Sequence, residues 1–231
     1  MEKTEKFIKT LFDRISARYD LFNTASSFFL DRYWRHAASA LLEKKDARVL
    51  DVCTGTGELA FQLSKRLNGG GRVIGIDFSE KMLFLAKEKV AGRRIKNVSF
   101  LLGKAEALSF PDALFDCVTS GFSMRNLMSL EKGLQEMFRV LKKGGRLVIL
   151  EINRPSNRLT GFLYRLYLRG IVPVVGFLTC GTFYPFLYLN QSVVGFLKPE
   201  EFCEKLRAAG FRDISYRGLA PGVIGLYDAF K

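Results

Sequence analysis

The 231-residue sequence holds few of the residues that build metal sites and disulfide frameworks. It has one histidine, His36, and four cysteines that lie far apart without a CxxC pair: Cys53, Cys117, Cys180 and Cys203. Each cysteine sits in an apolar stretch, which predicts buried free thiols in a reducing compartment. We therefore expect neither a zinc site nor any other metal centre.

Signals for secretion and for membrane crossing are missing as well. The first residues, MEKTEKFIKTLFDR, are charged throughout and lack the apolar core of a signal peptide. The most apolar stretch, 170–181, covers twelve residues and contains Pro173, whereas a membrane-spanning helix needs roughly 20 residues. These absences predict a cytoplasmic protein.

Positive charge, by contrast, is in large excess, with a formal net charge of +13. Such an excess points to nucleic acid, an anionic membrane surface or an acidic ligand, and it does not choose among them. The apolar fraction of 48% is enough for a large core and argues against disorder.

Short β-rich runs alternate with helical patterns between Arg48 and Leu150. The predicted strands are 49–53, 72–78, 98–102, 115–120 and 146–152, and the helices between them are 58–67, 80–90 and 130–141. Repeated units of this kind predict a Rossmann-like α/β fold, with a mostly parallel sheet and helices on both faces. The third helix is expected to stop at the Lys-Lys-Gly-Gly run 142–145.

The ends of the chain depart from this alternation. A last helix at 199–209 precedes runs at 211–218 and 222–230, which we expect to form an antiparallel hairpin at the sheet edge. The whole chain, 1–231, is predicted to be a single domain. It comprises an N-terminal helical segment (1–46), a cofactor-binding core (47–152), a helical, aromatic-rich insertion that caps the substrate (153–198), and a C-terminal helix and hairpin (199–231).

A glycine-rich turn follows the first predicted strand. Residues 51–60 read DVCTGTGELA and fit the pattern G-x-G-x-x-A, in which Gly55 and Gly57 allow a tight turn and close approach of a ligand. Asp77 ends the second strand 22 residues after Gly55, where a carboxylate can accept hydrogen bonds from both hydroxyls of a ribose. A nucleoside-containing ligand is therefore favoured over a purely structural turn.

NAD and S-adenosylmethionine both carry that ribose, so a second feature has to separate them. NAD needs a helix N-terminus aimed at its pyrophosphate, and Ala60 would permit that. A methyl donor instead needs an anion to meet its ammonium group, and Asp51 is suitably placed and charged. On these residues alone both ligands stay open.

Longer stretches resemble the motifs of class I methyltransferases, in the correct order. They are DVCTGTG (51–57), IDFSEKML (76–83), GKAEALSFPDALFDCV (103–118) and FRVLKKGGRLVILE (138–151). Over nearly its whole length the chain resembles the UbiE/MenG family of ubiquinone and menaquinone C-methyltransferases. Further matching pieces are YDLFN (19–23), Trp34-Arg35, AEAL (105–108), FSMRN (122–126), Tyr188-Leu189, Ser192 and APGV (220–223).

The resemblance implies S-adenosylmethionine as the cofactor, with contacts at matching positions. With the glycine turn, the predicted cofactor site comprises Asp51, Gly55, Thr56, Gly57, Asp77, Phe78, Lys104, Ala105 and Gly121. Two positions depart from the family, which usually has Asp or Asn at Lys104 and Ser or Ala at Gly121. A lysine cannot accept a hydrogen bond from an adenine amino group, so that contact would need the backbone, or Lys104 points to solvent.

The insertion has an unusual composition of its own. Residues 155–197 include nine aromatic residues and no Asp or Glu, and their only charges are Arg158, Arg165 and Arg169. Arg165 and Arg169 lie four residues apart and would share a helix face. The stretch is either a buried helical cap with a basic wet side, or a tunnel for an isoprenoid tail whose arginines meet phospholipid head groups. The second interpretation predicts peripheral contact with the anionic inner face of the cell membrane.

The reaction that the resemblance implies is C-methylation of a prenylated quinol, with demethylmenaquinol favoured over the benzoquinol precursor of ubiquinone. Such a reaction needs a base for the neighbouring phenol or a cation that stabilises the phenolate. We predict Arg125, beyond the fourth strand, as that cation, because open α/β sheets bind substrate at the carboxyl ends of their strands. The alternative for Arg125 is a salt bridge or a helix cap, and His36 sits in a helix that looks structural.

Three weaker candidates are predicted to line or close the substrate pocket: Tyr19, Asn23 and Tyr188. Tyr19 and Asn23 lie four residues apart, so on a helix they would share a face. The alternative for each is packing in the core.

Other functions are compatible with parts of the sequence. An RNA or DNA methyltransferase would suit the charge, but residues 120–123 read SGFS where amino-methylating enzymes carry an Asn/Asp-Pro-Pro-aromatic element. The basic residues also alternate with aliphatic ones rather than forming a patch, so no nucleic-acid partner is expected. A sterol, a tocopherol precursor or a phospholipid amine as acceptor would leave a similar sequence. A non-catalytic binding protein finds support only in Lys104.

Overall fold

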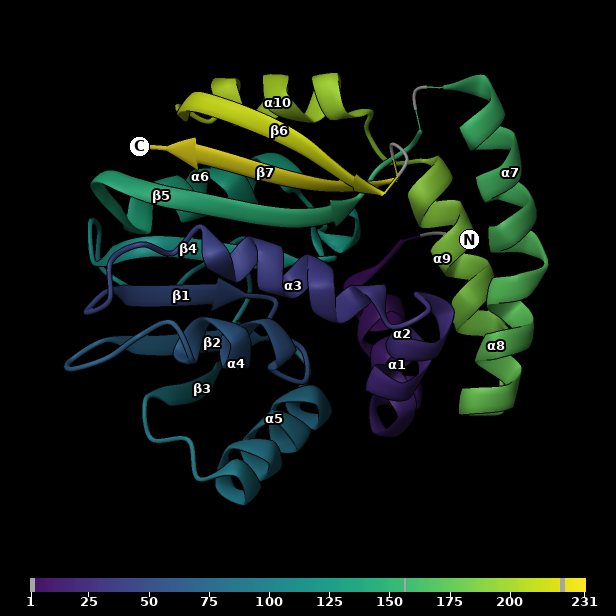
Figure 1. Cartoon of the computed structure of the whole chain (residues 1–231), viewed down its shortest axis with the longest axis horizontal. Helices are drawn as coiled ribbons and strands as arrows, with labels where there is room; N and C mark the ends of the chain where they lie inside the picture. Colours follow the sequence, from purple (N-terminus) through teal and green to yellow (C-terminus); the bar gives the residue numbers. More distant parts are fainter. Residues whose placement is uncertain (1–2, 156, 221–222) are drawn as a thin grey trace.

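The computed structural model describes residues 3–155, 157–220 and 223–231, and its centre is a seven-stranded sheet (Figure 1). The strand order is β3-β2-β1-β4-β5-β7-β6. The strands are β1 (Arg48–Val52), β2 (Arg72–Asp77), β3 (Val98–Leu102), β4 (Phe115–Gly121), β5 (Leu141–Ile152), β6 (Arg212–Ala220) and β7 (Ile224–Phe230). The first five pair in parallel, whereas β7 is antiparallel to both β5 and β6. The predicted α/β sheet with its antiparallel C-terminal hairpin is confirmed.

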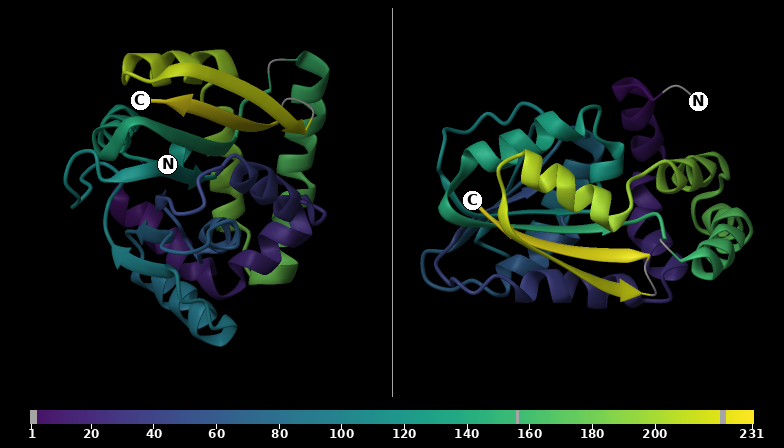
Figure 2. Two further views of the ribbon diagram at one scale, coloured as in Figure 1. Left: turned by 60° about the vertical axis from the view of Figure 1, so that its left-hand side comes forward. Right: turned by 90° about the horizontal axis from the view of Figure 1, so that it is seen from above.

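Helices cover both faces of the sheet and create two separate cores (Figure 2). One face carries α3 (Leu30–Ala40), α4 (Glu58–Ser64) and α5 (Glu80–Arg93), and the other carries α6 (Leu130–Val140) and α10 (Pro199–Ala208). Because both faces are covered, the central strands are continuous apolar runs rather than alternating ones. In β1, for example, Val49, Leu50 and Val52 are all fully buried.

The N-terminal segment and the insertion form one helical layer at the carboxyl ends of the parallel strands, at the right of Figure 1. The N-terminal helices are α1 (Glu5–Ile15), η1 (Ser16–Arg18) and α2 (Tyr19–Ser26), and the insertion folds into α7 (Arg158–Arg169), α8 (Ile171–Cys180) and α9 (Tyr184–Val194). Phe22 of α2 packs on Phe186 of α9, with ring centroids 4.1 Å apart. Segments far apart in the sequence therefore share a small core of their own.

Several predicted boundaries were wrong where pairing overrides local signals. The helix expected to reach residue 141 ends at Val140, and β5 begins at Leu141 rather than at residue 146. Leu141 pairs with Phe115, and Gly145 accepts a hydrogen bond from the backbone N–H of Lys231, so the expected glycine stop is drawn into the sheet. On the opposite face, α4 ends at Ser64, three residues early, and α5 continues three residues further to Arg93.

The four cysteines are free thiols, as predicted, but only Cys117 is buried. Cys53, Cys180 and Cys203 are partly exposed. Cys53 packs against the core on the α6 and α10 side of the sheet and also lines a cavity. Pro221 and Gly222 of the APGV motif lie outside the described residues.

Candidate active site

Two cavities adjoin at the carboxyl ends of the parallel strands. The first, of about 270 Å³, lies over the glycine turn and the end of β2, and the second, of about 310 Å³, lies between the N-terminal helices and the insertion. Both are mostly apolar, and they share the residues Phe12, Tyr19, Phe122 and Asn126. Two ligands placed in them would therefore meet across a common wall.

The glycine turn forms part of the floor of the first cavity. Gly55 has φ +56°, and a Cβ built there would find no atom within 4 Å, so its backbone faces open space. Gly57 serves packing instead, since a Cβ there would lie 2.8 Å from the Phe100 ring and 2.9 Å from the Phe61 ring. The first glycine leaves room for a ligand, and the second lets α4 approach β3.

Asp77 lies at the end of β2 and lines the first cavity. Its Oδ2 accepts a hydrogen bond from the backbone N–H of Gly55 and its Oδ1 from that of Ser79, each at 2.9 Å. Burial raises the pKa of this carboxyl to about 6, although both hydrogen bonds act in the opposite direction. Each oxygen keeps a lone pair for a further donor, which suits the ribose contact predicted for Asp77.

Asp51 lies deeper than expected. It is 1% exposed, and it accepts hydrogen bonds from the hydroxyls of Thr54 at 2.6 Å and Thr119 at 2.7 Å. Burial raises its pKa to about 6. The residue is not among those that line the first cavity, so a contact with a ligand ammonium group stays a prediction.

The other predicted cofactor residues divide into two groups. Phe78, Lys104, Ala105 and Gly121 line the first cavity, whereas Thr56 and Gly57 do not. Lys104 is exposed, and its Nζ lies 2.9 Å from the carboxylate of Glu5 of α1, which lines the same cavity, so its ammonium group is paired with a protein carboxylate. A hydrogen bond to adenine would therefore come from backbone groups near Ala105.

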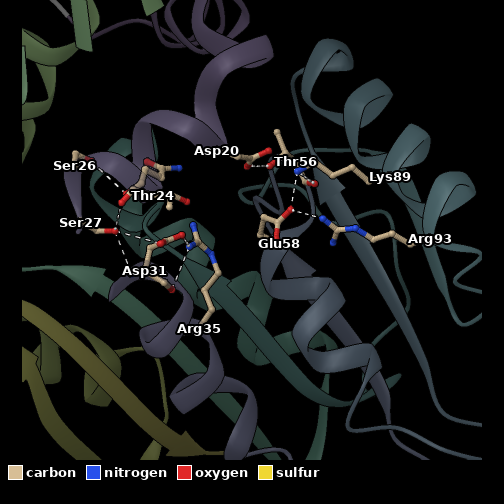
Figure 3. A network of polar contacts seen from close by, with 11 residues as sticks. Asp20, Thr24, Ser26, Ser27, Asp31, Arg35, Thr56, Glu58, Lys89 and Arg93 are labelled. Carbon is tan, nitrogen blue, oxygen red and sulfur yellow. Dashed lines mark hydrogen bonds and ion pairs between the residues drawn. The ribbon is translucent and has the colours of Figure 1, made fainter. Parts of the chain in front are cut away.

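Thr56 instead ties the glycine turn to the N-terminal segment, as Figure 3 shows. Its hydroxyl donates to Asp20 Oδ1 at 2.6 Å, and Lys89 Nζ donates to Asp20 Oδ2 at 2.5 Å and to Glu58 Oε1 at 2.8 Å. Asp20 directly follows Tyr19, which lines both cavities. The latch formed by Thr56, Asp20 and Lys89 therefore holds the wall between the cavities against the glycine turn.

The second cavity brings together all of the predicted substrate residues. Tyr19, Asn23, Arg125 and Tyr188 line it, and the predicted shared face of Tyr19 and Asn23 on one helix is confirmed. Tyr188 donates a hydrogen bond from its hydroxyl to Asn126 Oδ1 at 3.2 Å. The remaining walls are largely aromatic and aliphatic, from α1, α2, α3 and the insertion.

Arg125 is held by a buried partner that the sequence reasoning did not single out. Its Nη1 lies 2.6 Å from Glu151 Oε1 and 2.6 Å from the backbone oxygen of Phe122. The side chains of Arg125 and Glu151 are 6% and 0% exposed. Glu151 is the penultimate residue of β5, which pairs with β4, so the position of the neighbouring strand ends could have pointed to it.

Three tyrosines line the second cavity together with Arg125. Burial raises the pKa of Tyr19, Tyr164 and Tyr188 above the ordinary value for a phenol, and the charge of Arg125 partly offsets each rise. Arg125 lines the same cavity as these phenols, so its positive charge acts on groups inside that cavity. A phenolic ligand there would feel the same field.

His36 takes no part in either cavity. It is exposed on α3, with its Nε2 3.1 Å from Arg66 Nη2. The residues of α1 were also missed, although Glu5, Ile8 and Phe12 line the first cavity. Their amphipathic spacing was visible in the sequence, but nothing local indicated which surface they would cover.

Comparison with known proteins agrees with this arrangement. The whole chain, residues 1–231, matches the model of the ubiE/COQ5 methyltransferase family. It is 42% identical over 221 residues to the demethylmenaquinone methyltransferase of Deinococcus radiodurans, covering 95% of this chain and 90% of that one. It is 39% identical over 232 residues to the ubiquinone/menaquinone biosynthesis C-methyltransferase UbiE of Geobacter sulfurreducens, covering 100% of this chain and 90% of that one.

Solved structures share the fold at lower identity. A SAM-dependent methyltransferase from Aquifex aeolicus has a TM-score of 0.60 at 24% identity, and the match covers 81% of this chain and 84% of the Aquifex chain. The cyclase SpnF has a TM-score of 0.70 at 17% identity, covering 100% and 97%. The chain is an S-adenosylmethionine-dependent methyltransferase, and it belongs to the ubiE/COQ5 methyltransferase family.

Proposed function

We propose that the protein methylates a ring carbon of a prenylated quinol in quinone biosynthesis, with demethylmenaquinol as the preferred acceptor and the ubiquinone benzoquinol precursor as the second candidate. The relatives at about 40% identity carry one or both of these activities in their names. The observation that carries the proposal is the pair of adjoining cavities, with Arg125 in the second.

The first cavity fits S-adenosylmethionine, which supplies an activated methyl group on its sulfonium when bound. Asp77 is placed to accept the ribose hydroxyls, and the open backbone at Gly55 leaves room beside them. Phe78 and Ala105 contribute apolar walls for the adenine ring. Asp51, beneath the turn, adds negative charge near the amino-acid end.

The second cavity orients the acceptor and makes its ring more nucleophilic. The Nη1 of Arg125 donates to Glu151 and Phe122. Its Nε is buried without a hydrogen-bond partner among the described residues, so the edge formed by Nε and Nη2 is the one we expect to donate to a substrate oxygen. A hydrogen bond from a cation stabilises the phenolate relative to the phenol and so raises electron density on the ring carbon. Tyr188, anchored on Asn126, restricts how the ring can turn.

The apolar walls from α2, α8 and α9 suit the isoprenoid tail of the acceptor. Because such a tail partitions into lipid, we propose that the protein works from the cytoplasm at the inner face of the cell membrane. Arg165 and Arg169 are both exposed on α7, as their predicted shared face requires. They are the cations we expect to meet anionic head groups.

The test is transfer of a labelled methyl group from S-adenosylmethionine to reduced demethylmenaquinone in anionic vesicles. Parallel reactions contain the benzoquinol precursor, a phospholipid amine or bulk RNA in its place. We expect label in the naphthoquinol, less in the benzoquinol and none in the RNA or the amine.

Label in RNA or in the amine, with both quinols unlabelled, would overturn the proposal. Binding of S-adenosylmethionine is measured in the same preparation by calorimetry. A chain that binds the cofactor yet labels neither quinol shows that the second cavity serves another acceptor.

A further inference from the structure

We propose that the turn Phe28-Phe29 and the outer faces of α7 and α8 form a docking surface that inserts into an anionic phospholipid bilayer around the mouth of the second cavity. This docking proposal rests on the proposed function, because it requires an acceptor with a lipid tail. It also names the side chains around the entry route, which the composition of the insertion alone does not identify.

Exposed large apolar side chains are concentrated on this part of the molecule. Most of those among the described residues lie in two stretches, 21–33 and 159–194. They are Leu21, Phe28, Phe29, Leu30, Tyr33, Leu159, Phe162, Leu163, Leu166, Ile171, Val174, Phe177, Leu178, Phe183, Tyr184, Leu187 and Val194. The two stretches adjoin, since α2 packs on α8 and the hydroxyl of Tyr167 donates to the backbone oxygen of Ser26. A contiguous apolar surface of this kind marks an interaction site.

The Phe28-Phe29 turn is strained as well as exposed. Both residues have left-handed backbone angles, φ 52° and 66°, and their side chains are 68% and 67% exposed. Bulky residues rarely adopt this conformation, which glycine or asparagine would adopt at lower cost. Backbone strain that presents two aromatic rings to solvent indicates that the rings have a role other than stabilising the fold.

The second cavity opens at the same turn. Phe28 and Leu30 are exposed at the surface and also line the cavity, together with Ser26 and Ser27 between α2 and the turn. With the turn inserted into a bilayer, a lipid tail could pass from the acyl chains into the cavity without crossing water. The cost of exposing its apolar surface to water would then be avoided.

The charges around the surface favour an anionic bilayer over a second copy of this chain. Exposed arginines flank the apolar side chains: Arg18, Arg32, Arg158, Arg165 and Arg169. Among the described residues of 21–33 and 157–197 the only carboxylate is Asp31, which is buried and paired with Arg35. A two-fold dimer through this face would bring cations together without partners, whereas anionic head groups would match them.

The helices lie along such a surface rather than across it. Within the described residues, the 23-residue stretch Arg158–Cys180 is long and apolar enough to cross a membrane, because an 18-residue window within it has a mean hydropathy of 1.3, and 22% of that window is buried. It consists of two helices that meet at Gly170, and Arg165 and Arg169 lie in its middle. Its inner side packs on α2 and α9, so one face is left for lipid.

The first test is co-sedimentation of the purified protein with vesicles that contain phosphatidylglycerol, compared with vesicles of phosphatidylcholine alone. Phe29→Asn removes one ring, does not touch the cavity lining, and keeps a residue that tolerates the left-handed backbone. We expect it to weaken binding to anionic vesicles about tenfold. The matched control is Phe84→Gln, because Phe84 is 61% exposed on α5, away from α7 and α8 in Figure 1.

Activity separates docking from catalysis. With a short-tailed, water-soluble quinol, Phe29→Asn should turn over like the unmodified protein, and with a long-tailed quinol in vesicles it should be slower by a similar factor. Because vesicle binding is measured without any acceptor, it can succeed even if the quinol proposal fails.

A second measurement locates the ring in the bilayer. Trp34 is the only tryptophan, so a Phe29→Trp, Trp34→Phe variant carries a single fluorophore in the turn. We expect quenching by lipids brominated in their acyl chains and a shift of emission to shorter wavelength. No quenching, equal vesicle binding by Phe29→Asn and Phe84→Gln, or a dimer in solution that Phe29→Asn dissociates would each overturn the proposal.

Discussion

The two cavities are built in different ways. The floor of the first is formed by the ends of β1 and β2 and by the glycine turn, with Gly55 and Asp77 22 residues apart in the sequence, and α1 and residues 122–132 complete its walls. The second has no such floor and is assembled from side chains of α1, α2, α3, residues 122–126 and the insertion. A site made of backbone and strand ends admits little variation, whereas one made of packed aromatic side chains can be reshaped by substitution.

The largest effect should come from the buried ion pair that supports the second cavity. Glu151→Leu leaves the Arg125 guanidinium buried without its partner, and we expect a loss of about 3–5 kcal/mol in the free energy of unfolding. The double variant Arg125→Met, Glu151→Leu should recover most of that loss, because no charge is left buried. Urea unfolding measures both, and a double variant no more stable than Glu151→Leu would contradict the pairing.

Next in size, substitutions at the two glycines of the glycine turn should have different effects. Gly57→Ala forces a methyl group against Phe100 and Phe61, and we expect about 2–3 kcal/mol of destabilisation. Gly55→Ala meets no atom, so it should cost only about 1 kcal/mol of backbone strain. Its methyl group would instead enter the ligand space and weaken cofactor binding. Thermal unfolding measures the loss of stability, and cofactor titration measures the loss of binding. Equal losses of stability in the two variants would contradict the different roles of Gly55 and Gly57.

The two buried carboxylates near the glycine turn, Asp51 and Asp77, predict opposite pH trends for stability and for cofactor binding. In the cofactor-free protein the pKa of Asp51 and of Asp77 is raised to about 6 by burial, above the ordinary 3.8. The folded chain therefore holds protons that the unfolded chain has lost, and these two groups lower the free energy of unfolding as pH rises from about 4 to about 6. Cofactor affinity should change the other way, falling below about pH 6 as the carboxylates become neutral.

Asp77→Asn sharpens this prediction. It should weaken S-adenosylmethionine binding roughly tenfold to a hundredfold at neutral pH and remove part of the pH dependence of stability. The exposed Asp46→Asn is the control and should change neither. Calorimetric titrations between pH 5 and 8 would decide, and a wild-type affinity that is flat across this range would argue against a ribose contact.

The smallest effect concerns the latch of Thr56, Asp20 and Lys89, which joins the two regions. Thr56→Val removes the hydrogen bond to Asp20 and should cost about 1 kcal/mol of unfolding free energy. The double variant Thr56→Val, Asp20→Asn should lose less unfolding free energy than the sum of the losses in the two single variants. Thr10→Val, on the exposed side of α1, serves as the control. Fully additive losses in the double-mutant cycle would show that the latch couples nothing.

The same contrast explains which features the sequence revealed. The glycine turn, Asp77 and the parallel strands follow from local signals, namely apolar runs, turn residues and spacing. The extension of β5 to Leu141 could not be anticipated because it depends on pairing with β4 and on the C-terminal Lys231. Glu151 was within reach of topology alone, but the engagement of Thr56 with Asp20 and the depth of Asp51 depend on packing between remote segments.

The central claim is that the methyl donor occupies the first cavity and the quinol ring the second, beside Arg125. Its most direct test is single-turnover transfer of labelled methyl to demethylmenaquinol by Arg125→Met, Glu151→Leu, together with the cofactor dissociation constant of the same variant. We predict an unchanged dissociation constant and a transfer rate lower by roughly a hundredfold. An unchanged transfer rate would show that Arg125 only supports the fold and that the ring is held elsewhere.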